Sequence, residues 1–399
     1  MNPDLDRLHP YPFTRLDALR ASLQPPPQLD FISLAIGEPR HAAPGFVVEA
    51  LSRAGEDLGT YPQSAGLPGL RAACARWLER RFELAAGSVD AATSVLPLSG
   101  TREGLFALAQ AVIDRSTNPT VLMPNPFYQI YEGAALMAGA EPVYVNATAA
   151  SGFLPDLEAV TQEQWRRCQL LYLCSPGNPT GAVTGLDYLE RVLALADRYG
   201  FVVAADECYA EIYRDEHEPP PSLLQACVQT GRDGFDNCVV FHSLSKRSNV
   251  PGMRSGFVAG DPRIIEKFRL YRSYHGCAMP IHHQQASIAA WNDDQHVTAN
   301  RALYRAKFNS AGRRIAATLG CALPAAAFYL WAPAPGGDDE QFASQLYSKQ
   351  NVLALPGSYL ARETTGGNPG KGMVRLSLVA TGADCDAAAD RIEALVSGA

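Results

Sequence analysis

The feature that most constrains the fold is an alternation between short aliphatic runs and longer stretches with helical periodicity. Helical patterns at 103–112 and 186–198 lie between such runs, and the clearest runs fall at 120–123, 170–174, 201–205, 238–242 and 255–259. This alternation is typical of a parallel sheet whose strands are joined by crossover helices. It predicts a large α/β domain, followed by a mostly helical region and a final strand that we expect to form a smaller α+β domain.

The two ends of the chain carry clear local patterns. An apolar rhythm from Phe13 to Leu23 predicts a short helix that the following prolines end, and 31–36 is expected to form a strand. The glycine-rich segment 364–372 predicts a loop before a strand at 373–378. No linker divides the chain into independent halves, so both ends are expected to belong to one connected molecule.

Composition narrows the classes of partner. The chain has 399 residues, 47% of them hydrophobic, and a formal net charge of -7, which is typical of a soluble globular protein with a mildly acidic surface. No basic stripe is present to neutralise phosphates, which argues against nucleic acid. The sequence shows neither a secretory signal nor an apolar stretch long enough to span a bilayer, so a cytoplasmic location without membrane contact is expected.

Cysteine and histidine usage argues against disulfides and metal. The nine cysteines are an odd number and include no CxxC pair, which favours reduced, partly buried thiols. His282 and His283 are adjacent, and neighbouring side chains diverge on a helix or a strand, so one metal ion could hardly be held by both. No metal site is expected.

Polar residues follow two of the predicted strands at their carboxyl ends, where open parallel sheets bind ligands. The segment 175–181, SPGNPTG, presents Asn178 on a turn stiffened by two prolines, although an ordinary strand-exit turn is the alternative. Asp206 and Tyr209 follow the run 201–205. A carboxylate at a strand end can bond a protonated pyridine nitrogen, or it can cap the next helix.

Other candidate residues lie beside further strands. Lys246 stands just past a buried strand between hydroxyl-bearing residues, where desolvation could remove its proton and let it attack an aldehyde. Arg254 precedes the next strand and could clamp a phosphate with two parallel bonds. Gly100 and Thr101 could offer free N–H groups to an anion or form a plain helix cap. Tyr128 could cover a ring or belong to the core, and surface solvation is the alternative for the two cations.

The order of these sites along successive strand ends resembles that of fold-type-I pyridoxal-phosphate (PLP) enzymes, the class I/II aminotransferases in particular. The resemblance covers essentially the whole chain, and its most specific pieces are 176–181, 206–209 and 243–246 with Arg254 behind them. It implies a large domain with a mostly parallel seven-stranded sheet sandwiched by helices, and a smaller α+β domain. The expected boundaries are an N-terminal segment joining the small domain, the large PLP-binding domain and the small C-terminal domain, at 1–45, 46–284 and 285–399.

The resemblance implies a role for each matching residue at the cofactor. Lys246 would bond to the PLP aldehyde as a Schiff base and then shuttle the substrate proton, and Asp206 would bond the pyridine nitrogen. Asn178 and Tyr209 would bond the phenolic oxygen of the ring, on which Tyr128 would stack. The catalytic set is thus Lys246, Asp206 and Tyr209. The remaining cofactor contacts, mostly to the phosphate, are expected from Gly100, Thr101, Arg102, Ser243, Ser245 and Arg254.

Substrate contacts and a second subunit also follow from the resemblance. Gly37, Asn178 and Arg375 are expected to contact the substrate, with Arg375 binding its α-carboxylate under a closing segment that contains Gly37. Members of the family are homodimers with shared active sites. Tyr61 resembles the tyrosine that crosses to the phosphate of the partner subunit, and the stretch 271–283 is similarly placed, so a homodimer is expected.

A closer resemblance narrows the substrate. Segments 8–13, 36–41 and 245–256 are similar to those of the N-succinyldiaminopimelate aminotransferases of bacterial lysine biosynthesis, which exchange the amino group of glutamate with a keto-pimelate derivative. This resemblance implies N-succinyl-2-amino-6-oxopimelate as the amino acceptor. Its second acidic end would need a cation besides Arg375, and the candidates by sequence are Arg40, Arg247 and Arg272.

Two other functions remain open. A broad aspartate, alanine or aromatic aminotransferase, or a PLP lyase, would use the same cofactor site, because that site does not fix the reaction type. A PLP-binding sensor without catalysis would usually carry an added DNA-binding domain. The chain has neither the spare length nor a basic recognition helix for one.

Overall fold

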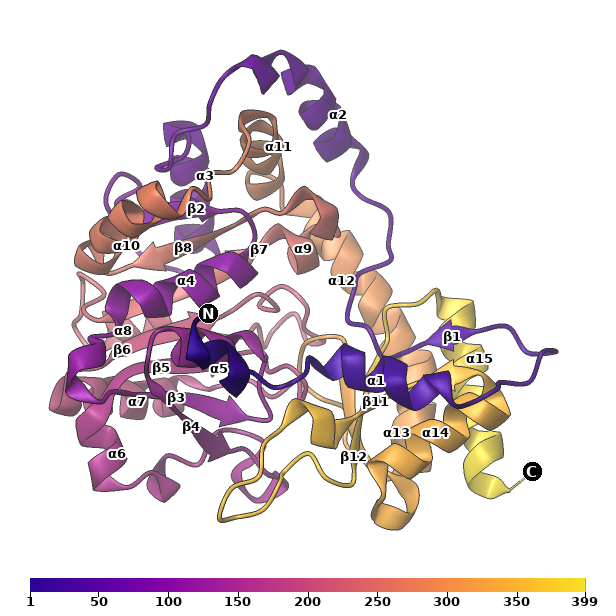
Figure 1. Ribbon diagram of the computed structural model, residues 1–399. Coiled ribbons are helices and arrows are strands. Elements are labelled where there is room, and N and C mark those ends of the chain that lie inside the picture. Colours follow the sequence, from indigo (N-terminus) through magenta and orange to yellow (C-terminus); the bar gives the residue numbers. More distant parts are fainter. Residues whose placement is uncertain (399) are drawn as a thin grey trace.

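The computed structural model describes residues 1–398, and a twisted sheet forms the middle of its larger part, on the left in Figure 1. Strand β8 runs antiparallel to both of its neighbours, and the other neighbouring strands are parallel. Within residues 1–398 the seven strands lie in the order β2 (Val95–Leu98), β8 (Gly256–Gly260), β7 (Cys238–Ser243), β6 (Val202–Asp206), β5 (Cys168–Cys174), β3 (Thr120–Asn125) and β4 (Glu141–Asn146). This confirms the predicted fold class.

Helices cover both faces of the sheet, because its buried strands are apolar on both sides. On β5, Leu170 and Tyr172 join one hydrophobic core, and Leu171 and Leu173 join the other, as the alternation of side chains along a strand requires. The first core is closed by α4 (Thr101–Val112), α5 (Ile130–Met137) and α10 (Pro262–His275). The second is closed by α3 (Pro68–Arg81), α6 (Gln162–Arg167), α7 (Leu186–Tyr199), α8 (Leu223–Gln229) and α11 (Ile281–Trp291).

A smaller part of the molecule contains the C-terminal region and residues 12–33, whereas the first residues of the chain lie beside α5 of the larger part (Figure 1). Its antiparallel sheet has the order β11 (Leu355–Pro356), β12 (Met373–Ser377) and β9 (Tyr329–Pro333). A separate parallel pair joins β1 (Ile32–Ser33) to β10 (Val352–Leu353). The helices of this part are α1 (Pro12–Ala21), α12 (Gln295–Lys307), α13 (Arg313–Leu319), α14 (Asp339–Gln350) and α15 (Gly382–Ser397). Helix α2 (Gly45–Arg53) instead packs on α11.

The structure extends or shortens several of the predicted elements. The strand expected at 31–36 is reduced to the two residues of β1, while β5 begins two residues earlier than predicted. The sequence did not predict β2 or β4, because Pro97 and Pro142 interrupt their aliphatic pattern. The domain boundaries at residues 45 and 285 remain predictions. None of the helices in residues 1–398 combines the length and apolar composition of a membrane span.

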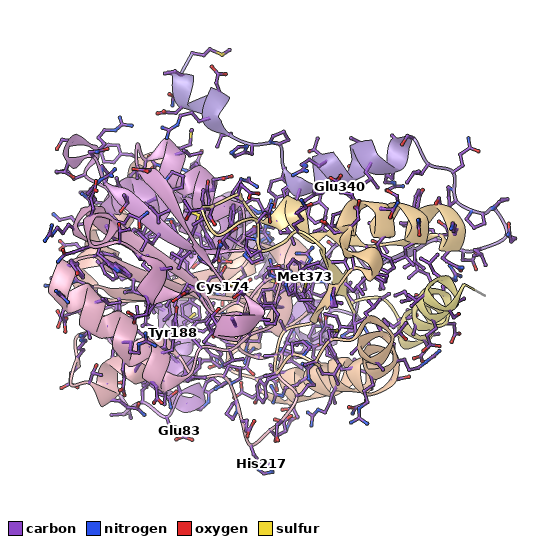
Figure 2. The ribbon with its side chains drawn as sticks, turned by 90° about the horizontal axis from the view of Figure 1, so that it is seen from below. Glu83, Cys174, Tyr188, His217, Glu340 and Met373 are labelled. Atoms are coloured by element: carbon purple, nitrogen blue, oxygen red, sulfur yellow. The ribbon has the colours of Figure 1, made fainter. Side chains whose placement is uncertain are left out.

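The parallel strands place their carboxyl ends along one edge of the sheet. Figure 2 shows Cys174, the last residue of β5, near the middle of the molecule, while Glu83 and His217 lie at its periphery. Asp206 and Ser243 end the next two strands in the spatial order. The strand-end residues singled out by sequence therefore gather where the sheet faces the smaller part of the molecule.

Candidate active site

A cavity of about 590 Å³ lies at these strand ends. It is lined from both parts of the molecule, because side chains of the sheet meet Tyr329 of β9 and Arg375 of β12 there. Of the residues predicted by sequence, the lining contains Gly37, Thr101, Arg102, Tyr128, Asn178, Asp206, Tyr209, Ser243, Ser245, Lys246, Arg254 and Arg375. Residues from distant parts of the sequence, such as Gly37 and Arg375, thus share one chamber.

Lys246 reaches the cavity from α9 (Leu244–Arg247), a single turn that follows β7 directly. The hydroxyl of Ser243 caps this turn by accepting a hydrogen bond from the backbone N–H of Ser245, at 3.1 Å. The Lys246 Nζ donates to the carbonyl oxygen of Gly37, at 2.9 Å. Burial is the largest cause that lowers the pKa of Lys246, which falls to about 8. A substantial fraction of this amine is therefore uncharged near neutral pH and able to act as a nucleophile.

Asp206 ends β6 and is buried. Its carboxylate accepts a hydrogen bond from the Tyr131 hydroxyl at 2.8 Å and one from the backbone N–H of Cys208 at 3.3 Å. Burial raises the pKa of Asp206, because these contacts do not fully replace hydration of the charge. A cationic N–H donor in the cavity, such as a protonated pyridine nitrogen, would stabilise the carboxylate.

An anion site lies where α4 begins. Gly100 caps the helix with a φ of 84°, and a side-chain Cβ at this position would stand 2.3 Å from the Arg254 Nη2. Glycine is thus required to let the guanidinium lie against the helix N-terminus, beside the unpaired N–H groups of the first turn. A guanidinium and a helix N-terminus at one place form a built site for a phosphate group.

Arg375 is buried and held from two sides. Its Nη1 donates to the Asn178 Oδ1 at 2.9 Å, and its Nη2 donates to the Ala35 carbonyl at 2.7 Å. Its Nε is buried without a hydrogen-bond partner within residues 1–398. The guanidinium also lies over the Tyr329 ring, 4.6 Å from the ring centroid. A charged donor fixed in this way is suited to bind a carboxylate.

Tyrosines complete the walls of the cavity. The Tyr209 and Tyr329 hydroxyls lie 2.6 Å apart and hydrogen-bond to each other. The Tyr128 hydroxyl accepts a hydrogen bond from the Arg102 Nε at 2.6 Å, and the Tyr11 hydroxyl accepts one from the Arg102 Nη2 at 3.3 Å. Arg102 is thus a cation of the cavity that the N-terminal segment helps to hold in place.

The structure contradicts two of the cations proposed for a second substrate contact. Arg247 donates to the Ala290 carbonyl and to Asp294, and Arg272 donates to the Pro97 carbonyl and to Glu103. Both guanidinium groups are buried and neither lines the cavity, so these predictions were wrong. Arg40 is exposed and also lies outside the cavity lining.

The sequence missed several residues of the site. Tyr329, Cys208 and Tyr11 line the cavity, and Tyr131 bonds to Asp206 from below the lining. Cys208 lies within the motif 206–209 and Tyr11 within the segment 8–13, but neither was assigned a role from the sequence, and the contacts of all four residues depend on tertiary packing. Tyr61 is 97% exposed and lies in a separate surface depression, so its expected contact with a partner subunit remains a prediction.

The arrangement fits PLP in its three chemically distinct parts. The guanidinium and helix N-terminus would hold the phosphate, the buried carboxylate would face the ring nitrogen, and the amine of low pKa would face the aldehyde. The cofactor would complement all three protein groups. Its phosphate would supply an anion to the guanidinium and helix N-terminus, its ring nitrogen a donor to the carboxylate, and its aldehyde a partner for the amine.

Comparisons with known proteins agree with this fit. The family model described as "Aminotransferase class I and II" matches residues 30–392. An LL-diaminopimelate aminotransferase of Nitratidesulfovibrio vulgaris Hildenborough is 32% identical over 396 residues, which cover 98% of either chain.

Two solved structures extend the comparison to the fold. An aminotransferase of Neisseria meningitidis Z2491 is 47% identical, with a TM-score of 0.94, and the match covers 100% of this chain and 99% of that one. A probable N-succinyldiaminopimelate aminotransferase of Thermus thermophilus is 27% identical, with a TM-score of 0.84, over 96% of this chain and 100% of that one.

Proposed function

The chain belongs to the class I and II aminotransferases, and from this premise we propose that it moves an amino group from glutamate to N-succinyl-2-amino-6-oxopimelate. Enzymes of this family depend on PLP, which when bound delocalises the electron pair left as the substrate carbon loses its proton. The proposal has two parts: the roles of the residues around the cofactor, and the identity of the acceptor.

The roles of the residues follow from their surroundings. With the cofactor bound, the uncharged form of the Lys246 amine would take the proton from the substrate carbon and hold it at Nζ for return to the neighbouring carbon. Asp206 would keep the ring nitrogen protonated, and, as the resemblance implies, Tyr209 and Asn178 would bond the phenolic oxygen. Arg375 orients the substrate carboxylate, so that the reacting C–H bond is presented to the amine.

The acceptor is inferred from Arg102, which lines the cavity together with Lys246, Arg254 and Arg375. Arg102 is exposed in the cavity lining and donates through Nη2 to the Tyr11 hydroxyl, while Arg375 is a buried residue of the same lining. A substrate with a carboxylate at each end satisfies both guanidinium groups, and a short monocarboxylate leaves Arg102 without an anion. This observation carries the proposal, and the T. thermophilus structure, whose name gives the same substrate, supports it.

A second candidate substrate is LL-diaminopimelate. Several relatives at 30–35% identity are LL-diaminopimelate aminotransferases. The distal end of that molecule carries an ammonium as well as a carboxylate, and Glu38 in the cavity lining could pair with the ammonium. The succinylated substrate has a neutral amide at this position.

The test compares the two substrates in the reverse direction. PLP-loaded protein is given 2-oxoglutarate with either N-succinyl-LL-diaminopimelate or LL-diaminopimelate, and glutamate formation is followed. We expect kcat/KM to favour the succinylated compound by at least about tenfold, the effect of one charge contact. A preference for aspartate, alanine or phenylalanine over both would overturn the proposal in favour of a broad aminotransferase.

A matched variant tests the role of Arg102. Arg102→Gln keeps an amide donor near Tyr128 but removes the charge. It is expected to lower kcat/KM for the long diacid about tenfold or more and to leave alanine turnover within about twofold. An equal loss for both substrates would mean that Arg102 acts on the cofactor and not on the distal carboxylate.

A further inference from the structure

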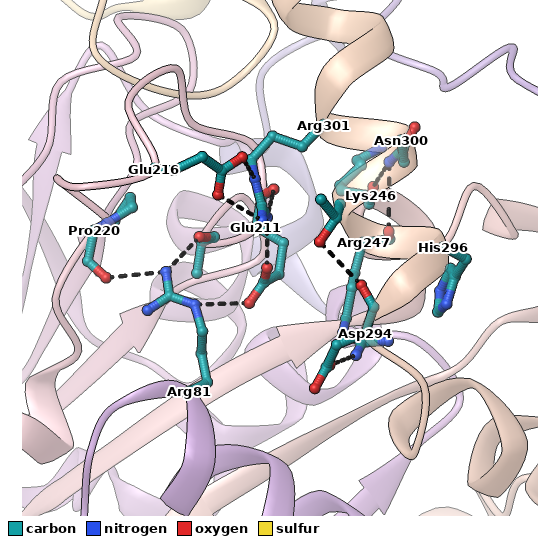
Figure 3. Close-up of polar contacts among 12 residues, drawn as sticks. Arg81, Glu211, Glu216, Pro220, Lys246, Arg247, Asp294, His296, Asn300 and Arg301 are labelled. Carbon is teal, nitrogen blue, oxygen red and sulfur yellow. Dashed lines mark hydrogen bonds and ion pairs between the residues drawn. The ribbon is translucent and has the colours of Figure 1, made fainter.

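The segment that follows β1 is tied to the Lys246 turn at two points. Gly37 accepts the hydrogen bond from the Lys246 Nζ, and four residues later the His41 Nδ1 lies 2.8 Å from the Asn300 Oδ1. Asn300 on α12 in turn donates to the backbone carbonyls of Lys246 and Arg247, at 3.3 and 3.4 Å (Figure 3). One end of the segment therefore meets the side chain of Lys246, and the other end meets its backbone through a single amide.

The partners of His41 fix which of its nitrogens carries the proton. The Asn300 Oδ1 also accepts from the Asn249 Nδ2 at 2.7 Å, so it is an acceptor, and the His41 Nδ1 must donate to it. The His41 Nε2 lies 2.7 Å from the Lys307 Nζ, whose ammonium also donates to the Val379 carbonyl at 3.2 Å. An ammonium can only donate, so His41 is neutral with its proton on Nδ1.

We propose that His41 is a positioning residue for Lys246, which it holds against the Gly37 segment through Asn300, while Lys307 fixes the His41 tautomer. The inference rests on the role of Lys246 in the proposed function. It adds that the environment of the amine is set from outside the cavity, since neither His41 nor Asn300 lines it.

Loss of the contact between His41 and Asn300 should change the pKa of Lys246. Desolvation is the largest cause of its low pKa, and Gly37 is one of the groups that cover the amine. The charged or ionisable groups that face the amine are Cys208 and Glu38, which raise its pKa, and Arg375 and Arg254, which lower it. Loosening of the Gly37 segment admits water and also weakens the contribution of Glu38, which belongs to that segment. Since desolvation is the largest cause of the shift, the pKa of Lys246 rises toward the ordinary lysine value of about 10.4.

Two substitutions separate positioning from packing. The amide of Asn in His41→Asn places a donor where the imidazole Nδ1 stood, but it leaves a void beside the Tyr304 ring, whose centroid lies 4.5 Å from that of His41. The ring of Phe in His41→Phe fills the void but cannot donate. A packing role ranks Phe above Asn, and the positioning role ranks Asn above Phe.

The readout uses the cofactor-free protein, so that it does not depend on turnover. Acylation of Lys246 by an N-hydroxysuccinimide ester is followed by mass spectrometry as a function of pH. We expect a midpoint near 8 for the wild type, a midpoint higher by roughly one unit for His41→Phe, and little shift for His41→Asn. Asn300→Leu, in which the new side chain has a similar volume, should show the same acylation midpoint as His41→Phe. It replaces the His41 variants in the test if either of them fails to fold. His217→Phe, on an exposed loop, is the control for the exchange itself.

The outcomes distinguish this inference from the proposed function. A wild-type midpoint near the ordinary lysine value of about 10.4 would remove the basis for Lys246 as the reactive amine. A low wild-type midpoint that stays unchanged in His41→Phe and Asn300→Leu would overturn the positioning role and leave the proposed function intact. In the PLP-loaded enzyme, His41→Phe should raise the KM for glutamate about tenfold and change kcat by less than about threefold, because the Gly37 segment lines the cavity and is expected to close over the substrate carboxylate.

Discussion

The loops that follow β6 and β7 perform equally central tasks but are supported by different chemistry. Helix α12 holds both of them through adjacent residues, Asn300 for the β7 loop and Arg301 for the β6 loop (Figure 3). Asn300 makes neutral hydrogen bonds to the backbone of the Lys246 turn, in addition to the ion pair of Arg247 with Asp294 at the start of the helix. Arg301 instead forms ion pairs with Glu211 and Glu216. One helix thus carries a neutral support and an ionic support side by side.

In the ionic support, the carboxylate of Glu211 is paired with two arginines. Glu211 lies five residues after Asp206 and is 8% exposed. It accepts from the Arg81 Nε at 2.8 Å and from the Arg301 Nη1 at 3.0 Å, and Arg81 also donates to the Ala210 carbonyl at 2.9 Å. Buried charges that satisfy one another are costly to separate, so this loop has one stable arrangement.

The difference matches what the two loops must do. In the proposed function Asp206 would face the ring nitrogen throughout the reaction, and a rigid support would serve that task. Lys246 would bond to the cofactor, be released and carry a proton, so its support would have to tolerate movement of the amine. Neutral hydrogen bonds worth about 1 kcal/mol each allow this. The predictions below test whether the two supports differ in this way.

The largest expected effect comes from breaking the ionic support. Glu211→Gln leaves the buried Arg301 and the partly buried Arg81 with one countercharge fewer, and it should lower the free energy of unfolding by about 3 to 5 kcal/mol. Urea unfolding of the cofactor-free protein measures it. Glu158→Gln, which ends an exposed pair with Arg191, should leave the midpoint unchanged. Equal midpoints for the wild type and Glu211→Gln would show that the network does not support the β6 loop.

The next prediction concerns the β7 loop, where a substitution at Lys246 should raise the free energy of unfolding and not lower it. The pKa of Lys246 is lowered to about 8 in the folded protein, so below pH 8 folding forces a poorly solvated ammonium into the cavity. Lys246→Met should therefore stabilise the cofactor-free protein by about 3 kcal/mol at pH 7, the equivalent of the shift in pKa. The gain should fade as the pH rises from 8 to about 10.4, where the wild-type amine loses its proton in both states.

Urea unfolding of both proteins at several pH values tests this reversal. Lys349→Met, at an exposed position of α14, is the matched control and should show no gain. A Lys246→Met protein that is less stable than the wild type at pH 7 would mean that the amine is well solvated, and the contrast between the loops would lose its functional meaning.

A smaller effect is expected on cofactor binding. Asp206→Asn keeps the shape of the side chain but replaces a charge-assisted hydrogen bond to the ring nitrogen with a neutral one. Affinity for PLP should fall by about 10- to 100-fold, the equivalent of about 1.5 to 3 kcal/mol. Fluorescence titration of the cofactor-free protein measures it. An unchanged affinity would mean that the fixed β6 loop does not present its carboxylate to the cofactor.

The sequence predicted what is local and missed what is long-range. The strands that end at Cys174, Asp206 and Ser243 were predicted because each is a buried aliphatic run, and the residues after them follow directly in the chain. The resemblance placed Arg375 correctly in the cavity lining, although it comes from a separate sheet. Fold and cofactor chemistry were therefore accessible without coordinates.

The supports behind the site were not accessible in this way. Asn300 and Arg301 lie in a helix without a motif, and nothing in their sequence indicates contact with loops that precede them by more than fifty residues. Arg247 was misassigned for a related reason. It follows Lys246 immediately, but consecutive side chains on a helical turn point in different directions, and its guanidinium is buried against Asp294 instead.

The smallest predicted effect tests the neutral support through pH. Burial and the nearby Lys307 ammonium lower the pKa of His41, and Asn300 opposes them. Because the unfolded chain binds a proton at about pH 6.5 and the folded protein does so at lower pH, stability should fall as the pH drops below 6.5, by at most about 1.4 kcal/mol per unit. His41→Asn lacks this proton and should show a shallower decline between pH 6.5 and 5, measured by urea unfolding. His296, whose pKa is also lowered, is present in both proteins and cancels. Equal slopes of stability against pH in the two proteins would mean that His41 takes up a proton as readily in the folded state as in the unfolded chain. Lys307 could then not be donating to the His41 Nε2, and the tautomer of His41 would not be fixed.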